Sequence, residues 1–219
     1  MTRTYDCGDP VERERGIAAA VEAVRRGDLV VLPTDTVYGI GADAFTPAAV
    51  RALLAAKKRG PDMPVPVLVG SWRTLDGLVH VMPPTGRDLV EAFWPGGLTL
   101  VVEHVRSLAW DLGNGDGTVA LRMPLHPVAL EVLNATGPMA VSSANVSGAP
   151  PATTAAEARD QLGWSVEVYL DAGSAGEPVA STIVDLTAET PRVLRLGAIG
   201  LDQLREVVPG LDAPAEERA

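Results

Sequence analysis

Residues 29–39 read LVVLPTDTVYG. The apolar run 29–32 predicts a buried strand, and Pro33 ends it because proline cannot donate to a sheet ladder. Two threonines and a carboxylate follow directly at 34–36. Open α/β sheets bind ligands at the carboxyl ends of their strands, so this turn is a candidate ligand site. The alternative is a turn whose threonines bond only to their own backbone.

Helical and extended patterns alternate on both sides of this stretch. Asp9 is the expected N-cap of a helix over 10–26, and Gly27 is its expected stop. The interleaving predicts an α/β fold with a twisted, mostly mixed or antiparallel sheet flanked by helices. Further helices are expected at 46–58, 71–79, 86–93, 127–135, 155–162 and 202–207, and further strands at 65–69, 98–103, 119–122, 139–142, 166–170, 182–186 and 193–196.

No convincing domain boundary interrupts this alternation. We therefore expect one domain over 10–208 and a flexible C-terminal tail over 209–219. Two glycine-rich stretches, 109–117 and 171–180, are expected to be mobile loops and candidate lids.

Composition excludes several classes of protein. The formal net charge of -10 disfavours a large nucleic-acid-binding surface, because an acidic surface repels phosphates. Cys7 is the only cysteine, which excludes a disulfide framework and a zinc quartet. No apolar stretch approaches the roughly 18 residues of a membrane span. The first residues resemble no secretory signal, so a cytoplasmic protein is expected.

The densest positive cluster is Lys57-Lys58-Arg59. Positive charge at a helix C-terminus complements the helix dipole, which is the simpler explanation. One such charge would suffice for that role, whereas three followed by a rigid proline- and glycine-containing stretch favour a phosphate clamp.

Three other features contain polar groups at strand ends. Small hydroxyl and amide side chains fill 142–148, directly after an apolar strand, although a polar loop is the alternative. Arg122 and Arg195 lie inside apolar strands, so each should meet a carboxylate or a phosphate. A structural ion pair would also satisfy either arginine. The sequence has no phosphate-binding P-loop, and its three histidines show no metal-ligand spacing.

In this order, seven segments resemble the YrdC/TsaC family of L-threonylcarbamoyladenylate synthases, in its short single-domain form. The resemblance covers about residues 13–208. The segments are Pro-Thr-Asp-Thr-Val-Tyr-Gly (33–39), Lys-x-Arg with a later proline (57–64), Trp-Pro-Gly-Gly-Leu-Thr (94–99), Arg-Met-Pro (122–124), Ser-Ala-Asn-Val-Ser-Gly (143–148), Ser-Thr-Ile-Val-Asp (181–185) and Arg-x-Gly (195–197).

The resemblance implies an open α/β fold with a deep concave cleft and assigns residues to two substrates. Threonine would be bound by Thr36, Arg122, Ser143 and Ser181. ATP would be bound by Arg59, Met63, Thr118, Asn145, Thr153 and Arg195. Lys57 and Arg59 would act on the phosphates as the catalytic pair.

The implied reaction joins L-threonine, bicarbonate and ATP into threonylcarbamoyl-AMP, with release of pyrophosphate. Mg²⁺ would accompany ATP, and no protein ligand for the metal is predicted. Other tRNA-modification proteins would then transfer the threonylcarbamoyl group. Direct nucleic-acid binding is expected to be weak or absent, and no membrane partner is expected.

The sequence departs from the family pattern in three places. Gly60-Pro61 replaces a proline directly after the arginine, Pro64-Val65 replaces Pro-Leu, and Leu68 replaces a histidine of many relatives. Two alternatives stay open. One is a non-catalytic factor that binds tRNA or double-stranded RNA, and the other is a related protein that handles a carbamoyl-adenylate.

Overall fold

The computed structural model describes residues 2–60, 64–113, 117–176 and 179–214. Within these residues the helices are α1 (Pro10–Arg26), α2 (Pro47–Ala56), α3 (Leu75–Leu78), α4 (Pro84–Phe93), α5 (Pro127–Thr136), α6 (Ala155–Leu162) and α7 (Leu201–Val207). The strands are β1 (Arg3–Asp6), β2 (Val30–Leu32), β3 (Gly39–Asp43), β4 (Val67–Leu68), β5 (Leu98–Glu103), β6 (Thr118–Arg122), β7 (Met139–Ser143), β8 (Val168–Asp171), β9 (Thr182–Asp185) and β10 (Arg192–Arg195). Two 3₁₀ turns are η1 (Trp72–Thr74) and η2 (Gly163–Ser165).

The first helix forms where its capping residues predict it. Val11 N and Glu12 N donate to Asp9 Oδ1 at 2.9 and 2.8 Å. Gly27 closes the helix in the left-handed conformation at φ 86°, which glycine adopts without steric cost. The predicted bounds of α1 and α6 are confirmed, and α2 is two residues shorter at its C-terminal end than the 46–58 prediction.

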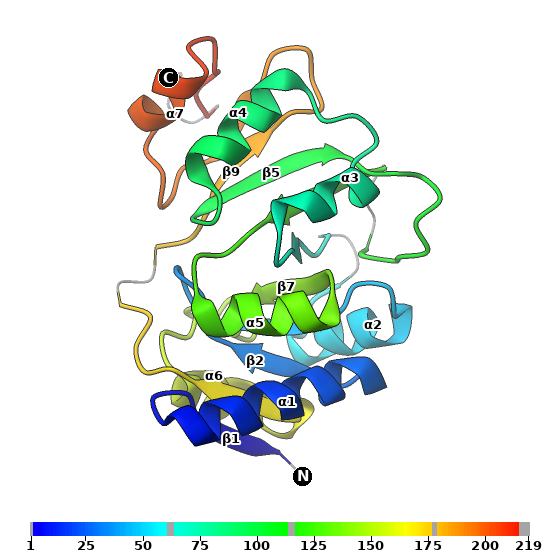
Figure 1. Ribbon diagram of the computed structural model, residues 1–219, viewed down its shortest axis with the longest axis vertical. Coiled ribbons are helices and arrows are strands. Elements are labelled where there is room, and N and C mark those ends of the chain that lie inside the picture. Colours follow the sequence, from blue (N-terminus) through cyan, green and yellow to red (C-terminus); the bar gives the residue numbers. More distant parts are fainter. Residues whose placement is uncertain (1, 61–63, 114–116, 177–178, 215–219) are drawn as a thin grey trace.

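One sheet holds all ten strands in the order β1-β8-β2-β3-β7-β4-β6-β5-β9-β10 (Figure 1). Five neighbouring pairs are antiparallel and four are parallel. The predicted mixed α/β sheet flanked by helices is therefore confirmed. The alternation of the chain places β2, β3 and β7 side by side at the centre, where the turn after β2 meets the end of β7.

Sequence patterns did not predict two of the strands. β1 is mostly exposed and pairs with β8 along its whole length, so it carries little apolar signal. β3 contains Gly39 and Gly41, which are poor strand formers. A Cβ added at Gly39 would lie 2.6 Å from Val141 Cγ1. The glycine is therefore required by the close packing of β3 against β7.

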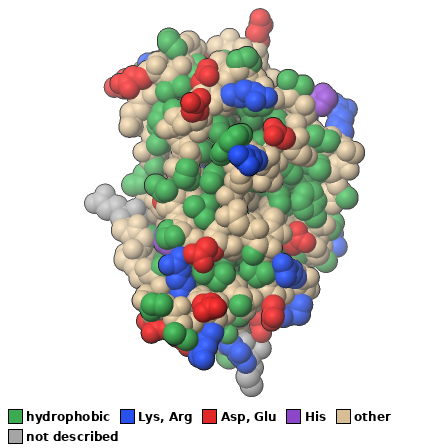
Figure 2. Space-filling view, viewed as in Figure 1, with side chains coloured by type: hydrophobic (Ala, Val, Ile, Leu, Met, Phe, Trp, Pro, Cys, Tyr) green, Lys and Arg blue, Asp and Glu red, His purple; other side chains and the backbone are tan. Residues whose placement is uncertain are grey.

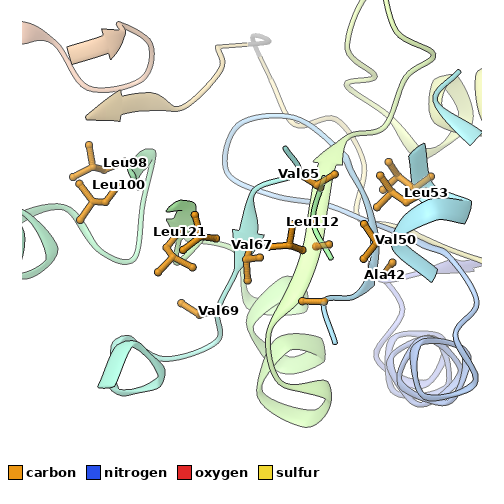
Figure 3. Packing of buried hydrophobic residues seen from close by; sticks show 14 of the residues in the cluster. Ala42, Val50, Leu53, Val65, Val67, Val69, Leu98, Leu100, Leu112 and Leu121 are labelled. Atoms are coloured by element: carbon orange, nitrogen blue, oxygen red, sulfur yellow. The ribbon is translucent and has the colours of Figure 1, made fainter. Parts of the chain in front are cut away.

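The two faces of the sheet contact separate apolar clusters. Successive strand residues point to opposite faces, so Val67 joins one cluster and Leu68 the other. Figure 3 shows side chains of α2, β4, β5 and β6 turned toward the larger cluster. The second cluster lies under α1 and α5, which pack beside each other (Figure 1).

Structure extends beyond the predicted domain bounds of 10–208. β1 precedes residue 10, and Leu211 is only 2% exposed. Val193 N donates to Asp212 O at 2.9 Å, so the part of the predicted tail up to residue 212 is docked on β10. Residues 215–219 of that tail lie outside the described residues.

Both expected mobile loops are partly fixed. Trp110 stacks on Phe45 with ring centroids 5.6 Å apart, and Leu112 is buried. In the other loop, Tyr38 Oη donates to Gly173 O at 2.6 Å and accepts from Ala172 N at 3.0 Å. Residues 114–116 and 177–178 lie outside the described residues. No helix in the described ranges is long and apolar enough to cross a membrane.

Candidate functional site

The turn between β2 and β3 uses its threonines in two different ways. Thr34 Oγ1 donates to Val37 O at 2.6 Å and accepts from Thr36 N at 3.2 Å. Thr34 therefore stabilises the turn itself, which is the structural role foreseen as the alternative. Thr36 Oγ1 lies 3.1 Å from Thr34 Oγ1 and also accepts a hydrogen bond from Arg122 Nη1 at 2.9 Å, so its side chain links the turn to a distant strand.

Arg122, at the end of β6, is buried and forms an ion pair with the Asp35 carboxylate, as expected for a buried cation. Its Nη2 donates to Asp35 Oδ1 at 2.7 Å, and its Nε donates to Gly96 O at 2.9 Å. Burial lowers the pKa of Arg122, the Asp35 carboxylate opposes that shift, and Arg195 adds to it by repulsion. Because a guanidinium has five N–H groups, one hydrogen on each terminal nitrogen is left without a partner among the described residues.

A second group of polar contacts surrounds Ser181, directly before β9. Thr99 Oγ1 donates to Ser181 Oγ at 2.8 Å, and Arg195 Nη2 donates to the same oxygen at 3.2 Å. Arg195 also donates from Nε and Nη2 to Ser181 O, at 3.1 and 2.8 Å. Ser181 and Thr99 are buried, so their hydroxyls are held in fixed positions.

These two groups form one unit. Thr182 N donates to Gly97 O at 2.9 Å, and the repulsion of Arg195 acts on the pKa of Arg122. We call Thr36, Thr99, Arg122, Ser181 and Arg195 the hydroxyl–arginine cluster. It combines two cations with three hydroxyl groups, which suits a small ligand with a carboxylate and further polar groups.

Lys57 lies just beyond α2 and is 2% exposed. Its Nζ donates to Ser143 O, to Asn145 O at 2.8 Å and to Asn145 Oδ1 at 3.3 Å. An ammonium has three N–H groups, so these three acceptors satisfy all of them. Burial, followed by repulsion from Arg59, lowers the pKa of Lys57 to about 8.

The loop after β7 is shaped around this lysine. Asn145 Nδ2 donates to Val146 O at 3.0 Å and to Ala149 O at 2.7 Å, so both amide hydrogens are used inside the loop. Ser147 N donates to Lys57 O at 2.9 Å. We call Lys57 together with residues 143–149 the lysine loop.

Arg59 differs sharply from its neighbour Lys57. Its Nη2 donates to Pro64 O at 3.3 Å, while its Nε is buried without a hydrogen-bond partner in the described part of the chain. Burial lowers the pKa of Arg59. A buried donor without a partner is costly, which makes Arg59 a natural contact for an anionic ligand.

The hydroxyl–arginine cluster and the lysine loop meet at the centre of the sheet. Ala144 N donates to Tyr38 O at 2.8 Å, and Gly39 pairs with Ser143 in the β3–β7 ladder. The structure thus bonds Thr36 to Arg122 and Ser181 to Arg195, and it bonds Lys57 to Ser143 and Asn145 in the lysine loop. The repulsion that Arg59 exerts on Lys57 places it next to the lysine loop.

The remaining predicted residues are less closely connected. Thr118 begins β6, about 13 Å along the strand from Arg122. Thr153 Oγ1 donates to Glu157 Oε2 at 3.0 Å, next to Ala152, whose carbonyl accepts from Tyr38 N. Met63 lies outside the described residues.

Sequence patterns missed three participants in this site. Asp35 lies in the candidate turn at 34–36, but its partner Arg122 is far away in sequence. Thr99 ends the motif at 94–99, to which the family resemblance assigns no ligand. Tyr38 holds the 171–176 stretch through its hydroxyl group.

Leu68 and two surface cavities lie apart from the hydroxyl–arginine cluster. The Leu68 side chain packs in the apolar cluster under α1 and α5. One cavity of about 790 Å³ is lined by Trp72, His80 and Trp94, and another of about 320 Å³ by Cys7 and Glu131. Neither cavity contains a residue of the hydroxyl–arginine cluster, so the deep cleft stays a prediction.

A metal ion would find few ligands here. In the parts of the chain that the structure describes, no three His, Cys, Asp or Glu side chains are grouped so that they could hold one.

Known proteins are similar to this chain in sequence and in fold. The Sua5/YciO/YrdC family model, described as "Telomere recombination", matches residues 22–197. A Mycobacterium tuberculosis protein, named provisionally as a threonylcarbamoyl-AMP synthase, is 62% identical over 97% of this chain and 98% of its own length. The threonylcarbamoyl-AMP synthase of Pyrococcus abyssi is 36% identical over 95% of this chain and 61% of its own length.

One similar solved structure contains a ligand. The crystal structure of P. abyssi Sua5 complexed with L-threonine matches with a TM-score of 0.90 and 33% identity. The match covers 97% of this chain and 62% of that one, so the present chain spans less than two thirds of the archaeal protein. From the family model and the sequence identities together, this chain belongs to the Sua5/YciO/YrdC family.

Proposed function

We propose that this chain is an L-threonylcarbamoyladenylate synthase, which makes threonylcarbamoyl-AMP and pyrophosphate from L-threonine, bicarbonate and ATP. The observation that carries the proposal is the hydroxyl–arginine cluster, in which buried Arg122 bonds to the Thr36 hydroxyl and exposed Arg195 bonds to Ser181, which also accepts from Thr99. The relatives that share most of this chain bear the name of that enzyme.

Threonine would bind at this cluster. The Arg122 guanidinium, already neutralised in part by Asp35, offers its two remaining hydrogens to the carboxylate. Thr36 and Ser181 supply hydroxyl groups beside it, and Ser143 lies across the β3–β7 ladder from the same turn. The L-threonine bound to the archaeal relative supports this choice of amino acid.

ATP would lie between the cluster and the lysine loop. Arg59 offers a donor without a protein partner, and Arg195 adds positive charge. Lys57 contributes its charge next to Arg59, although its hydrogens are all occupied. Met63, Thr118, Asn145 and Thr153 complete the proposed ATP contacts on the strength of the family resemblance.

The proposed chemistry needs alignment and positive charge rather than a protein nucleophile. The threonine amine attacks the bicarbonate carbon to give a carbamate with loss of water. A carbamate oxygen then attacks the α-phosphorus, and the bond to pyrophosphate breaks, which makes the enzyme a nucleotidyltransferase. Mg²⁺ would enter with ATP on phosphate and water oxygens and neutralise phosphate charge.

Pyrophosphate release tests the proposal. Release should require threonine, bicarbonate and ATP together, and mass spectrometry should detect threonylcarbamoyl-AMP. Arg59→Ala should lose about 100- to 1,000-fold in kcat/KM, because a preorganised charge is removed. Lys58→Ala, one residue away and exposed, is the matched control and should stay near wild type. Release that does not depend on threonine would reject the proposal.

An RNA-binding factor without catalysis is less favoured. The chain has a net charge of -10, and Figure 2 shows acidic, basic and apolar side chains interspersed over one face. Strong sequence-independent binding needs clustered positive charge. We propose instead that the labile product passes to separate tRNA-modification proteins. Other amino acids in place of threonine would reveal a related carbamoyl-adenylate reaction, since product would then form without threonine.

A further inference from the structure

The Trp94–Thr99 segment contacts both halves of the proposed threonine site. Gly96 O accepts from Arg122 Nε at 2.9 Å, and Gly96 N donates to Met123 O at 2.8 Å. At the other end, Thr99 Oγ1 donates to Ser181 Oγ at 2.8 Å. One short segment therefore sets the positions of the arginine and of the serine that would bind the substrate.

The Ser181 hydroxyl can bond to a ligand only as a hydrogen-bond donor. A hydroxyl oxygen has two lone pairs and one hydrogen. Thr99 Oγ1 and Arg195 Nη2 both donate to Ser181 Oγ, so they occupy both lone pairs. The hydrogen of Ser181 has no acceptor among the described residues, so it is available to a ligand that accepts a hydrogen bond.

Thr99 itself is 3% exposed, within β5. Its hydroxyl reaches Ser181 rather than solvent, and Ser181 in turn is bonded to the Arg195 guanidinium. An anionic oxygen is the acceptor that such surroundings favour.

We propose that Thr99 is a positioning residue for amino-acid selection. By donating to Ser181, it forces the serine hydrogen toward the substrate and so selects a carboxylate over a carboxamide at that place. The inference rests on the proposed function and deepens it, because it names the feature of threonine that the site recognises.

Thr99→Val tests the inference, since valine keeps the shape of threonine and removes its hydroxyl. The substitution frees one lone pair of Ser181, which can then accept an N–H of a carboxamide. The ratio of kcat/KM for L-threonine over L-threoninamide should fall about tenfold, while the KM for ATP stays within about twofold. Thr99→Ser retains the hydroxyl and should keep the wild-type ratio.

A double-mutant cycle separates positioning from general packing. In a Ser181→Ala background, Thr99→Val should change the threonine-to-threoninamide ratio no further. Thr99→Ala, which removes the hydroxyl with a smaller side chain, replaces Thr99→Val if valine prevents folding. An unchanged ratio in Thr99→Val, or additive effects in the cycle, would overturn the inference.

Failure of the proposed function gives a different result. If the wild-type chain makes no threonylcarbamoyl-AMP, the proposed function is rejected. Calorimetric titration of the same variants with threonine and threoninamide then tests the selection directly. Equal loss of preference in Thr99→Val and Thr99→Ser would contradict it there as well.

Discussion

Lys57 and Arg122 are both buried cations, but their surroundings differ. The Lys57 ammonium is held by carbonyl and amide oxygens of one loop, and no carboxylate of the described residues lies within salt-bridge distance of it. Arg122 meets Asp35 at 2.7 Å and keeps two hydrogens for another partner. The lysine loop is thus complete in itself, whereas the hydroxyl–arginine cluster is ready to receive a ligand.

This difference separates two roles that the Lys-x-Arg pattern combines. Lys57 shapes the loop that follows β7, while Arg59, two residues later, has a buried Nε without a partner in the described chain. Charge alone therefore does not identify a ligand contact. The number of hydrogens that the fold has already used decides between support and binding.

The largest expected effect on stability comes from removing the Lys57 ammonium group from the lysine loop. Lys57→Met removes the donor of three oxygens, and two of these, on Asn145, have no other donor in the described contacts. Unfolding free energy should fall by about 3 kcal/mol. The melting temperature should then drop by roughly 6–12 °C. Lys58→Met, at an exposed neighbour, is the control, and equal melting of the two variants would contradict the supporting role of Lys57.

A steric change should disturb the hydroxyl–arginine cluster instead. A Cβ at Gly197 would overlap Ala180 O and lie 2.8 Å from the Ser181 carbonyl carbon. Gly197→Ala should therefore destabilise by about 2–3 kcal/mol and lower activity, because the backbone at Ser181 must shift. Gly77→Ala has open space around its Cβ and serves as control. Denaturant unfolding measures the stability of both variants. A Gly197→Ala variant as stable as wild type would show that the close packing of residue 197 against residues 180–181 does not require glycine.

Removing the counter-charge of Arg122 should have a smaller effect. Asp35→Asn keeps the shape but leaves the buried guanidinium without a carboxylate, at a cost of about 2 kcal/mol. Asp28→Asn breaks an exposed pair with Arg26 and should cost about 0–1 kcal/mol. Thermal unfolding compares the two variants. Similar melting temperatures would mean that Arg122 does not depend on Asp35.

A last effect concerns the pH dependence of stability and again distinguishes the two cations. The pKa of Lys57 is about 8 in the folded chain, against 10.5 for an unperturbed lysine. Between these values the unfolded state binds more protons, so stability should rise with pH. The unfolding free energy of wild type relative to Lys57→Met should therefore increase from about pH 8 to pH 10.5. A flat difference across that range would contradict the buried, carboxylate-free environment of Lys57.

Local patterns predicted most of the fold. Caps at Asp9 and Gly27 defined α1, and apolar runs defined β5 and β7 to within one residue. β1 and β3 were missed because an exposed edge strand and a glycine-containing strand lack an apolar pattern. Residue 212 is docked because of a pairing with Arg192, which no local pattern reveals.

The candidate site was predictable as a set of segments but not as a network. The family motifs select Thr36, Arg122 and Ser181 together, and the structure bonds Thr36 to Arg122 and Ser181 to Thr99. The partners of these groups were not predictable, because hydrogen bonds such as Arg122 to Asp35 or Thr99 to Ser181 join distant segments. Which hydrogens remain free depends on those bonds.

A crystal structure with L-threonine and a non-hydrolysable ATP analogue would test the central claim most directly. We predict a threonine carboxylate oxygen within about 3.2 Å of Ser181 Oγ and of an Arg122 terminal nitrogen, and a phosphate oxygen at Arg59 Nε. Threonine bound instead in the cavity lined by Trp72 and Trp94, with the hydroxyl–arginine cluster unchanged, would contradict the account.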